Sequence, residues 1–248
     1  MFDFSAFFAQ YGNLFLQGTI DTLVMTCVAT ILAYVIGIPL GILLVVTSPN
    51  GLRPNRVVST IVGWIVNIGR SVPFIILLVA LIPFTRFIVG TSLGVPGAVV
   101  PLVVTAAPFA ARMVEQSLEE TDSGLVEAAQ SFGASTWQIV WKVYLKETLP
   151  SLVRGAAITF VTLFGYSAMA GTVGAGGLGD IAIRYGYQRF QTDVMIFAVL
   201  LCVVLVIVFQ AIGDVTARKI DKRRRLIAPR NIKRSRFPRE AASLFMGM

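Results

Sequence analysis

Long runs of hydrophobic residues, separated by short polar segments, dominate this amino-acid sequence. A helix needs roughly 20 apolar residues to cross a bilayer, because hydrocarbon offers its backbone groups no partners outside the helix. Five runs meet this requirement, at residues 23–46, 57–82, 93–114, 152–170 and 194–212. The pattern predicts an all-α integral membrane protein with about five transmembrane helices.

The composition agrees with lipid as the main solvent of the chain. Hydrophobic residues make up 56% of the 248 residues, charged residues only 14%, and the mean hydropathy is +0.78. Histidine is absent, which removes the commonest general base and metal ligand. Cys27 and Cys202 lie inside apolar runs without the spacing of a metal site, so we interpret them as packing residues. Residues 1–18 lack the basic segment and cleavage site of a signal peptide, so the first run is expected to remain as a span.

The distribution of basic residues predicts the orientation in the membrane. The chain has 21 Lys and Arg against 13 Asp and Glu, and most of the basic residues fall on one predicted side. The other side holds only Arg86, Arg184 and Arg189. The positive-inside rule therefore places the N-terminus outside and the C-terminus in the cytoplasm. Residues 1–218 are predicted to form the transmembrane domain. Residues 219–248 are predicted to form a basic cytoplasmic tail at the lipid surface, with a specific partner site in the tail as the alternative.

One charged residue, Arg70, falls inside the second apolar run, beside Gly69 and shortly before Pro73. A charge exposed to hydrocarbon costs roughly 3 kcal/mol or more, and proline interrupts a helix. We therefore expect residues 57–68 to run along the cytoplasmic interface or to form half of a kinked span, so that Arg70 faces protein or water. We interpret Arg70 as an intramembrane anchor, and a role as a substrate ligand is the alternative.

The predicted cytoplasmic loop at residues 115–149 is long and polar, and it is patterned as two short helices. Asp122 or Ser123 can cap the first helix, and Gly133 suits the position just after its end. Its apolar residues repeat with helical spacing: Leu125, Ala129 and Phe132.

The second short helix of this loop is predicted to begin at Ser135. Gln138 stands three residues later and completes the spacing of a capping box, and Pro150 limits the helix. Periodicity alone also permits a helix pair that lies on the lipid headgroups without a protein partner.

The ordered string Glu127-Ala128-Ala129, Gly133-Ala134, Val143 and Leu145 closely resembles the signature loop of the permease subunits of bacterial ABC importers. In that family, the loop carries a coupling helix that docks into the ATPase subunit and passes its motion to the spans. The resemblance implies the following coupling residues: Glu127, Ala128, Ala129, Phe132, Gly133 and Ala134. Small residues let such a helix seat closely, while Phe132 offers apolar contact and Glu127 a charge. Lys146 departs from the family, which usually has proline there, and this bears on the bend after the coupling helix.

Further segments narrow the resemblance, over residues 19–216, to the methionine-uptake permeases. They are GRSVPFIILL at 69–78, IPFTR at 82–86, GYSAMAG at 165–171, GGLGD at 176–180 and RYGY at 184–187. The resemblance implies the type I ABC importer permease fold in a bacterial inner membrane. It also implies a homodimer bound to two ATPase subunits that use ATP and Mg²⁺, and an external substrate-binding lipoprotein that delivers methionine. No cofactor of this chain and no nucleic-acid partner are expected.

The fourth apolar run ends with Tyr166, Ser167 and Met169 between glycines. Small residues let helices approach closely near a dimer axis, and methionine is adaptable and polarizable, which suits a gate for a thioether substrate. We predict that these residues line the substrate path or gate, with Ser167 and Met169 at a closed outer gate. Ordinary packing between helices is the alternative.

Three glycines, Gly174, Gly176 and Gly179, match the spacing of a dinucleotide-binding motif. No predicted strand precedes them, as that motif requires, and the loop is expected to face outward. We interpret these glycines as permitting tight turns in a loop over the outer mouth.

Two other classes of function are less consistent with the sequence. An ion-coupled carrier of a small amino acid, the main alternative, usually needs a carboxylate or histidine inside the membrane, whereas Asp21, Asp193 and Asp214 fall near predicted span ends. A membrane enzyme would need a catalytic constellation, and no recognised motif is present. The chain also lacks a P-loop, so we predict a permease that is not itself an enzyme and relies on ATP hydrolysis in a separate subunit.

Overall fold

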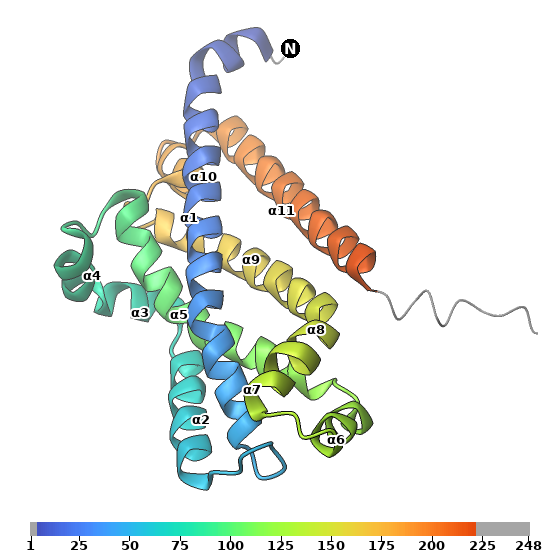
Figure 1. Cartoon of the computed structure of the whole chain (residues 1–248). Helices are drawn as coiled ribbons and strands as arrows, with labels where there is room; N and C mark the ends of the chain where they lie inside the picture. Colours follow the sequence, from blue (N-terminus) through green and yellow to red (C-terminus); the bar gives the residue numbers. More distant parts are fainter. Residues whose placement is uncertain (1–3, 222–248) are drawn as a thin grey trace, which may run out of the picture.

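Helices make up almost the whole of residues 4–221, the part of the chain that the computed structural model describes (Figure 1). Within it, four helices are long and apolar enough to cross a membrane: α1 (Phe4–Thr47), α5 (Gly94–Glu119), α9 (Leu149–Gly171) and α11 (Thr192–Ile220). A bent pair, α2 (Arg56–Ser71) and α3 (Phe74–Ala80), passes the same test when counted as one span. The prediction of an all-α protein with about five spans is confirmed.

Short helices fill the connections between the long ones. They are α4 (Ile82–Val89) after α3; α6 (Ser123–Ser131), α7 (Thr136–Ile139), the π-helical η1 (Val140–Tyr144) and α8 (Leu145–Glu147) between α5 and α9; and α10 (Gly177–Ile181) and the π-helical η2 (Ala182–Tyr187) before α11. The two short helices predicted in the polar loop thus correspond to α6 and α7, and the second continues through η1 into α8.

α1 is much longer than the first predicted span. Its 44 residues correspond to about 66 Å along the helix axis at 1.5 Å per residue, roughly twice the 30 Å thickness of the hydrocarbon core, and the axis bends near the beginning of the helix (Figure 1). The early turns carry Phe7 and Phe15, whose rings lie against that of Phe197 in α11 at centroid distances of 5.5 and 4.6 Å. The extension is therefore stabilised by aromatic packing against a distant helix, which a search for one hydrophobic span does not detect.

α2 and α3 meet at an angle of 98°. The break lies at Val72, whose extended backbone (φ −84°, ψ 124°) precedes Pro73. Proline lacks the N–H that would continue the helix, and it disfavours a helical conformation in the residue before it. The structure shows the kinked arrangement expected for this segment and places Arg70 in the last turn of α2.

Small residues allow α1 and α5 to pack closely. A Cβ atom added at Gly37 would lie 2.7 Å from the Cβ of Ala110, and one added at Gly41 would lie 2.6 Å from a methyl group of Val114. Around them, buried residues of both helices form one cluster, including Met25, Ala29, Ala33, Leu102 and Ala106. Close approach through small residues is typical of helix contacts in membranes, where van der Waals packing replaces the hydrophobic effect.

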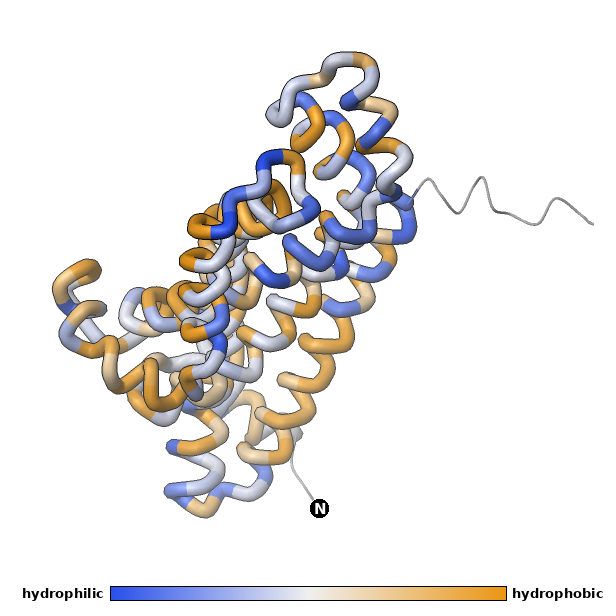
Figure 2. Tube along the Cα trace, turned by 90° about the horizontal axis from the view of Figure 1, so that it is seen from below, coloured by the Kyte–Doolittle hydropathy of each residue, from blue (hydrophilic) through white to orange (hydrophobic). Residues whose placement is uncertain are grey.

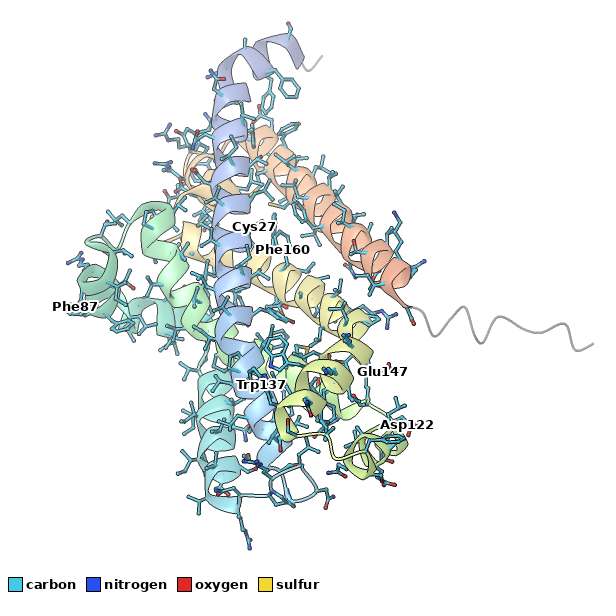
Figure 3. All side chains as sticks on the ribbon, viewed as in Figure 1. Cys27, Phe87, Asp122, Trp137, Glu147 and Phe160 are labelled. Atoms are coloured by element: carbon cyan, nitrogen blue, oxygen red, sulfur yellow. The ribbon has the colours of Figure 1, made fainter. Side chains whose placement is uncertain are left out.

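α11 packs against α9 on one side and is largely exposed on the other. The ring of Phe209 stacks on Phe160 of α9 with the centroids 4.5 Å apart. Cys27 and Cys202 are free thiols that pack against the same apolar cluster, as expected for packing residues (Figure 3 labels Cys27 and Phe160). The opposite face of α11 exposes apolar side chains suited to lipid: Ile196, Leu200, Val203 and Ile207.

Segments that were predicted to share the cytoplasmic side lie together at one end of the molecule. Arg53, before α2, donates from Nε to Oγ1 of Thr136 in α7 at 3.1 Å, and Arg154 of α9 pairs with Asp221 after α11 at 3.5 Å. Hydrophilic residues gather at this end, whereas apolar residues dominate the middle of the helices (Figure 2). The compartment that this end faces stays a prediction, and residues 222–248 of the predicted basic tail lie outside the described part.

Candidate coupling surface and substrate path

α6 is defined by hydrogen bonds at both of its ends. At the beginning, the Asp122 carboxylate accepts from the N–H of Gly124 at 2.8 Å, so Asp122, of the two expected candidates, is the cap. At the end, Gly133 adopts the left-handed conformation (φ 75°), and the N–H of Ala134 donates to the carbonyl of Ala129 at 3.0 Å. This is a Schellman ending, and it confirms the predicted position of Gly133 just after the helix.

The capping box predicted for the second short helix is present. The N–H of Ser135 donates to Gln138 Oε1 at 2.9 Å, and the N–H of Gln138 donates to Ser135 Oγ at 3.4 Å. The helix continues to Thr148, and Pro150 then stands in the first turn of α9, where the missing N–H costs little. Lys146, the departure from the family pattern, is exposed in α8.

Some of the predicted coupling residues in and around α6 pack against the rest of the chain, and the others are exposed. Ala129 and Ala134 are half-buried and pack against a cluster that includes Val114 of α5. Glu127, Ala128 and Gly133 are exposed, and the Phe132 side chain is 92% exposed. The apolar positions therefore do not form one buried stripe, because Leu125 and Phe132 face outward while Ala129 faces the chain.

We define the coupling surface as the exposed side of α6 and α7, which carries Leu125, Glu127, Ala128, Phe132, Gly133 and Trp137. Three of these side chains, Leu125, Phe132 and Trp137, are large and apolar, and they lie at the hydrophilic end of the molecule. Figure 3 labels Trp137 in α7 and Asp122 at the beginning of α6. Large apolar side chains exposed outside the hydrocarbon region favour a partner surface.

A groove next to the coupling surface was not predicted from the sequence. It has a volume of about 530 Å³ and lies between the turn at residues 48–52, the end of α5 and α6, with Glu119 and Glu127 in its lining. The turn is tight because a Cβ atom at Gly51 would clash with the carbonyl oxygens of Val45 and Val46. The Asn50-Gly51 pair signals such a turn, but nothing in the sequence places it beside α6.

The three predicted gate residues at the end of α9 do not share one environment. Tyr166 stacks on Phe74 of α3, with the ring centroids 4.7 Å apart and the planes 7° apart. Ser167 is buried, and its hydroxyl donates to the carbonyl of Phe164 at 2.7 Å. Met169 is 48% exposed. Ser167 and Met169 therefore occupy different faces of α9, and their role as a gate stays a prediction.

Arg70 lies beside a pocket of about 230 Å³ that α2, α5 and α9 enclose. The guanidinium carbon is 5.9 Å from the centroid of the Phe109 ring, within the range of a cation–π contact. The Arg70 side chain is exposed, and no carboxylate among residues 4–221 lies within 4.0 Å of it. Among the described residues, the interpretation of Arg70 as an anchor is supported by this ring contact and by a longer-range attraction to Glu115.

The glycine-rich turn, residues 174–179, packs over the end of α9 and against α1. Gly174 and Gly176 have φ values of 88° and 80°, which confirms that they form tight turns. The same prediction is wrong for Gly179, which lies in α10 and instead permits close contact with Ala168 of α9. The carbonyl of Gly174 accepts from the N–H of Gly94 at 2.9 Å, and Thr22 Oγ1 of α1 accepts from the N–H of Leu178 at 2.9 Å. These contacts tie the turn to the beginning of α5 and to α1.

This arrangement of broken and continuous spans around a polar helical loop is that of a known class of permeases. A family model described as "Binding-protein-dependent transport system inner membrane component" matches residues 37–226, which include the whole coupling surface. The chain belongs to this family of multi-pass inner-membrane transport components.

Within the family, the resemblance to methionine permeases is confirmed. The chain is 50% identical over 216 residues to the probable D-methionine transport system permease protein MetI of Vibrio cholerae, an alignment that covers 87% of this chain and 96% of that protein. It is 44% identical over 181 residues to the methionine import system permease protein MetP of Bacillus subtilis, which covers 73% of this chain and 82% of that one.

Solved structures confirm the type I ABC importer permease fold. An inward-facing structure of the methionine ABC transporter MetNI aligns with a TM-score of 0.84 at 51% identity, covering 85% of this chain and 97% of that one. A structure of an amino acid ABC transporter with histidines aligns with a TM-score of 0.72 at 18% identity, a likeness that shows the fold alone.

Proposed function

We propose that this chain is the membrane-spanning permease subunit of an ABC importer that moves methionine, or a closely related amino acid, into the bacterial cytoplasm. The observation that carries the proposal is the 50% identity to a D-methionine permease over nearly the full length of that relative. The methionine transporter structure supports it, because it aligns over 97% of its own permease chain.

Energy for transport comes, in this proposal, from a separate ATPase subunit. The chain has no P-loop of its own, so ATP and Mg²⁺ are bound by the partner. Two copies of this chain and two ATPase subunits form the complex, and an external lipoprotein delivers the substrate. The N-terminus lies outside and the basic tail in the cytoplasm, an orientation that the positive-inside rule supports.

The coupling surface is the part of the chain that engages the ATPase. Phe132 supplies the apolar anchor, because almost all of its side chain is available to a partner. Glu127 supplies a charge at the same surface, and Gly133 leaves room for close approach, since a Cβ atom there would meet nothing within 4 Å of this chain.

Reconstitution in proteoliposomes tests the function. We expect uptake of radiolabelled methionine only when the permease, its ATPase, ATP and the receptor protein are all present. Uptake by the permease alone, driven by a proton or sodium gradient, would instead support the ion-coupled carrier. In that carrier an acidic residue would be expected within the spans. Asp21 lies inside α1 and not near its end as predicted, but it stands beside Gly176 of the glycine-rich turn.

Substitution of Gly133 tests the coupling role. We expect Gly133→Trp to separate ATP hydrolysis from transport, because the added bulk prevents the helix from seating. Any side chain is strained at φ 75°, so Gly133→Asn is the matched control, since asparagine tolerates the left-handed conformation without the bulk. Full stimulation of hydrolysis by substrate-loaded receptor in the tryptophan variant would contradict the proposed contact.

The outer gate is tested by Met169→Ala and Ser167→Ala, each assayed for methionine uptake at matched ATPase rates. We expect Met169→Ala to reduce the coupling ratio, because its exposed thioether is removed from the path. Unchanged uptake and unchanged coupling in both variants would leave these residues with a packing role only.

A further inference from the structure

The pocket beside Arg70 is lined by one stripe of side chains from each of two helices. On α5, Thr105 and Phe109 are four residues apart, and on α9, Thr159, Thr162 and Tyr166 are spaced by three and four. Residues with these spacings project from the same face of a helix. The end of α2 closes the third side, so the pocket depends on the break between α2 and α3.

Arg70 forms no ion pair within 4.0 Å among residues 4–221, although it lies close enough to Glu115 for a longer-range electrostatic attraction. The neighbouring Arg112 is already satisfied, since it pairs with Glu115 at 2.6 Å and donates to Asn67 at 2.7 Å. Arg70, by contrast, lies over the face of the Phe109 ring, and its exposed side chain lines the pocket. A guanidinium presents a planar fork of donors that matches a carboxylate with two parallel hydrogen bonds.

The hydroxyl groups at the pocket offer acceptors rather than donors. Thr105 Oγ1 donates to the carbonyl of Pro101 at 2.8 Å, and Thr162 Oγ1 donates to the carbonyl of Ile158 at 2.9 Å. Because each hydrogen is committed to the helix backbone, each oxygen keeps its lone pairs for another group. Acceptor oxygens of this kind suit an ammonium group.

The remaining lining is aromatic and apolar. Phe109 and Tyr166 bring rings to the pocket, and Leu163 adds aliphatic surface. One face of the Tyr166 ring is occupied by its stack with Phe74, which fixes the orientation of the ring. A thioether makes favourable contacts with aromatic rings, so the lining suits a methionine side chain. The volume of about 230 Å³ is below the roughly 300 Å³ at which pockets for drug-sized ligands begin, and it suits one small amino acid.

We propose that this pocket is a transient binding site for the amino acid during its passage, with Arg70 bound to the carboxylate, Thr105 and Thr162 to the ammonium group, and Phe109 and Tyr166 to the side chain. The proposal rests on the proposed function and adds a site inside the permease that selects for a free carboxylate. Arg70 is then a ligand, where the sequence favoured an anchor. One guanidinium in an open pocket gives weak binding, which a passing substrate requires in order to leave.

Photo-crosslinking in the purified permease–ATPase complex in nanodiscs tests the site without the receptor. The probe is the methionine analogue in which a diazirine replaces the thioether, and labelled peptides are mapped by mass spectrometry. We expect label on the segments that line the pocket, around residues 105–109 and 159–166. Excess methionine should abolish this label, whereas 3-(methylthio)propylamine, which lacks the carboxylate, should not compete.

Variants identify the residues responsible. Arg70→Gln should raise the methionine concentration needed for half-competition by roughly tenfold or more, since hydrogen bonds to charged groups contribute about 1.5–3 kcal/mol. Arg70→Lys should recover part of the loss because it keeps the charge, and Thr162→Val should weaken competition without changing the shape of the side chain. Arg86→Gln is the matched control, because this exposed arginine lies on α4, outside the pocket.

Each result decides the proposal. Label confined to other segments, or equal competition by the decarboxylated amine, would overturn it. The proposal is also overturned if the methionine concentration needed for half-competition in both Arg70→Gln and Thr162→Val equals that of the unmodified chain. If the Arg70→Gln permease does not assemble with its ATPase, the half-competition concentrations of Arg70→Lys and Thr162→Val decide whether these two residues bind methionine. Receptor-dependent methionine uptake by the unmodified complex is measured in parallel, so that normal uptake without pocket labelling rejects this site alone, whereas absent uptake rejects the proposed function.

Discussion

The coupling surface and the glycine-rich turn both depend on glycine, but for different physical reasons. At the coupling surface, Gly133 is needed for its left-handed backbone, and a Cβ atom there would meet open space. In the turn, Gly177 combines a left-handed backbone with a Cβ position only 2.6 Å from Thr22 Oγ1, and a Cβ atom at Gly179 would clash with the backbone of Ala168. Glycine thus shapes an exposed helix end in one region and permits a buried contact in the other.

The difference shows which region is complete within this chain. The glycine-rich turn has its contacts inside the molecule, against α1, α5 and α9. The coupling surface exposes Phe132 and Trp137 outside the apolar middle of the helices, so its apolar area is available to another protein. Substitutions in the turn should therefore affect stability, whereas substitutions at the coupling surface should affect association and leave stability unchanged.

The largest effect is expected from Gly179→Val. Its side chain would be forced into the backbone of α9, which cannot yield as a flexible side chain can, and overpacking of this kind typically costs about 1–3 kcal/mol. Thermal unfolding of the purified permease should show a melting temperature lowered by several degrees. Gly12→Val is the control, because a Cβ atom at Gly12 meets nothing within 4 Å. An equal loss in both variants would argue against the steric explanation.

Phe132→Ala should give the next largest effect, and on a different quantity. The side chain is 92% exposed, so the melting temperature should not change, but removal of an interface anchor typically costs about 2 kcal/mol of binding energy. Titration of the ATPase subunit onto the permease should show association weakened by more than tenfold. Phe87→Ala on α4, where the side chain is 87% exposed and far from α6 (Figure 3), should bind the ATPase normally. Unchanged affinity of the Phe132 variant would remove the main support for the coupling surface.

Asp122→Ala should have a smaller, local effect. Loss of the N-cap destabilises a helix by about 1 kcal/mol, so α6 should open more often while the rest of the chain is unaffected. Hydrogen exchange of residues 123–131 should be several-fold faster, and ATPase affinity should fall less than with Phe132→Ala. Asp122→Asn keeps an acceptor oxygen and should restore most of the protection. Exchange as slow as in the unmodified chain would mean that tertiary packing alone holds α6.

Ser135→Ala should give the smallest effect of the series. Its hydroxyl accepts at 3.4 Å, a longer contact than that of Asp122, so we expect a loss of about 0.5 kcal/mol in the stability of α7. Hydrogen exchange across residues 136–144 measures it. Ser131→Ala is the control, since that hydroxyl donates to the carbonyl of Glu127 and caps no helix. A larger change than with Asp122→Ala would reverse the expected order.

Features that depend on neighbours in the chain were predictable from the sequence. The caps at Asp122, Gly133 and Ser135 follow from side-chain chemistry over a few residues, and the spans follow from the length of apolar runs. Features that depend on distant contacts were not predictable. The extension of α1 depends on Phe197, and the pocket at Arg70 needs Tyr166, which only folding brings near.

One sequence-based grouping took too little account of helical geometry. Ser167 and Met169 were paired because both stand at the end of a glycine-flanked helix, but two residues apart on a helix is about 200° of rotation. Ser167 accordingly faces the protein interior and Met169 is exposed. The helical period contains this information, and a test for a shared face would have separated the two residues.

The 98° break at Val72 also constrains how the membrane interior is hydrated. The last carbonyl groups of a helix have no partners within it, and Pro73 has no N–H to offer them. Non-helical backbone at membrane depth is tolerated only inside protein or along a water-filled cavity, and the exposed side chain of Arg70 stands beside the break. The carbonyl groups at the break therefore need either a protein neighbour from outside this chain or water at this level.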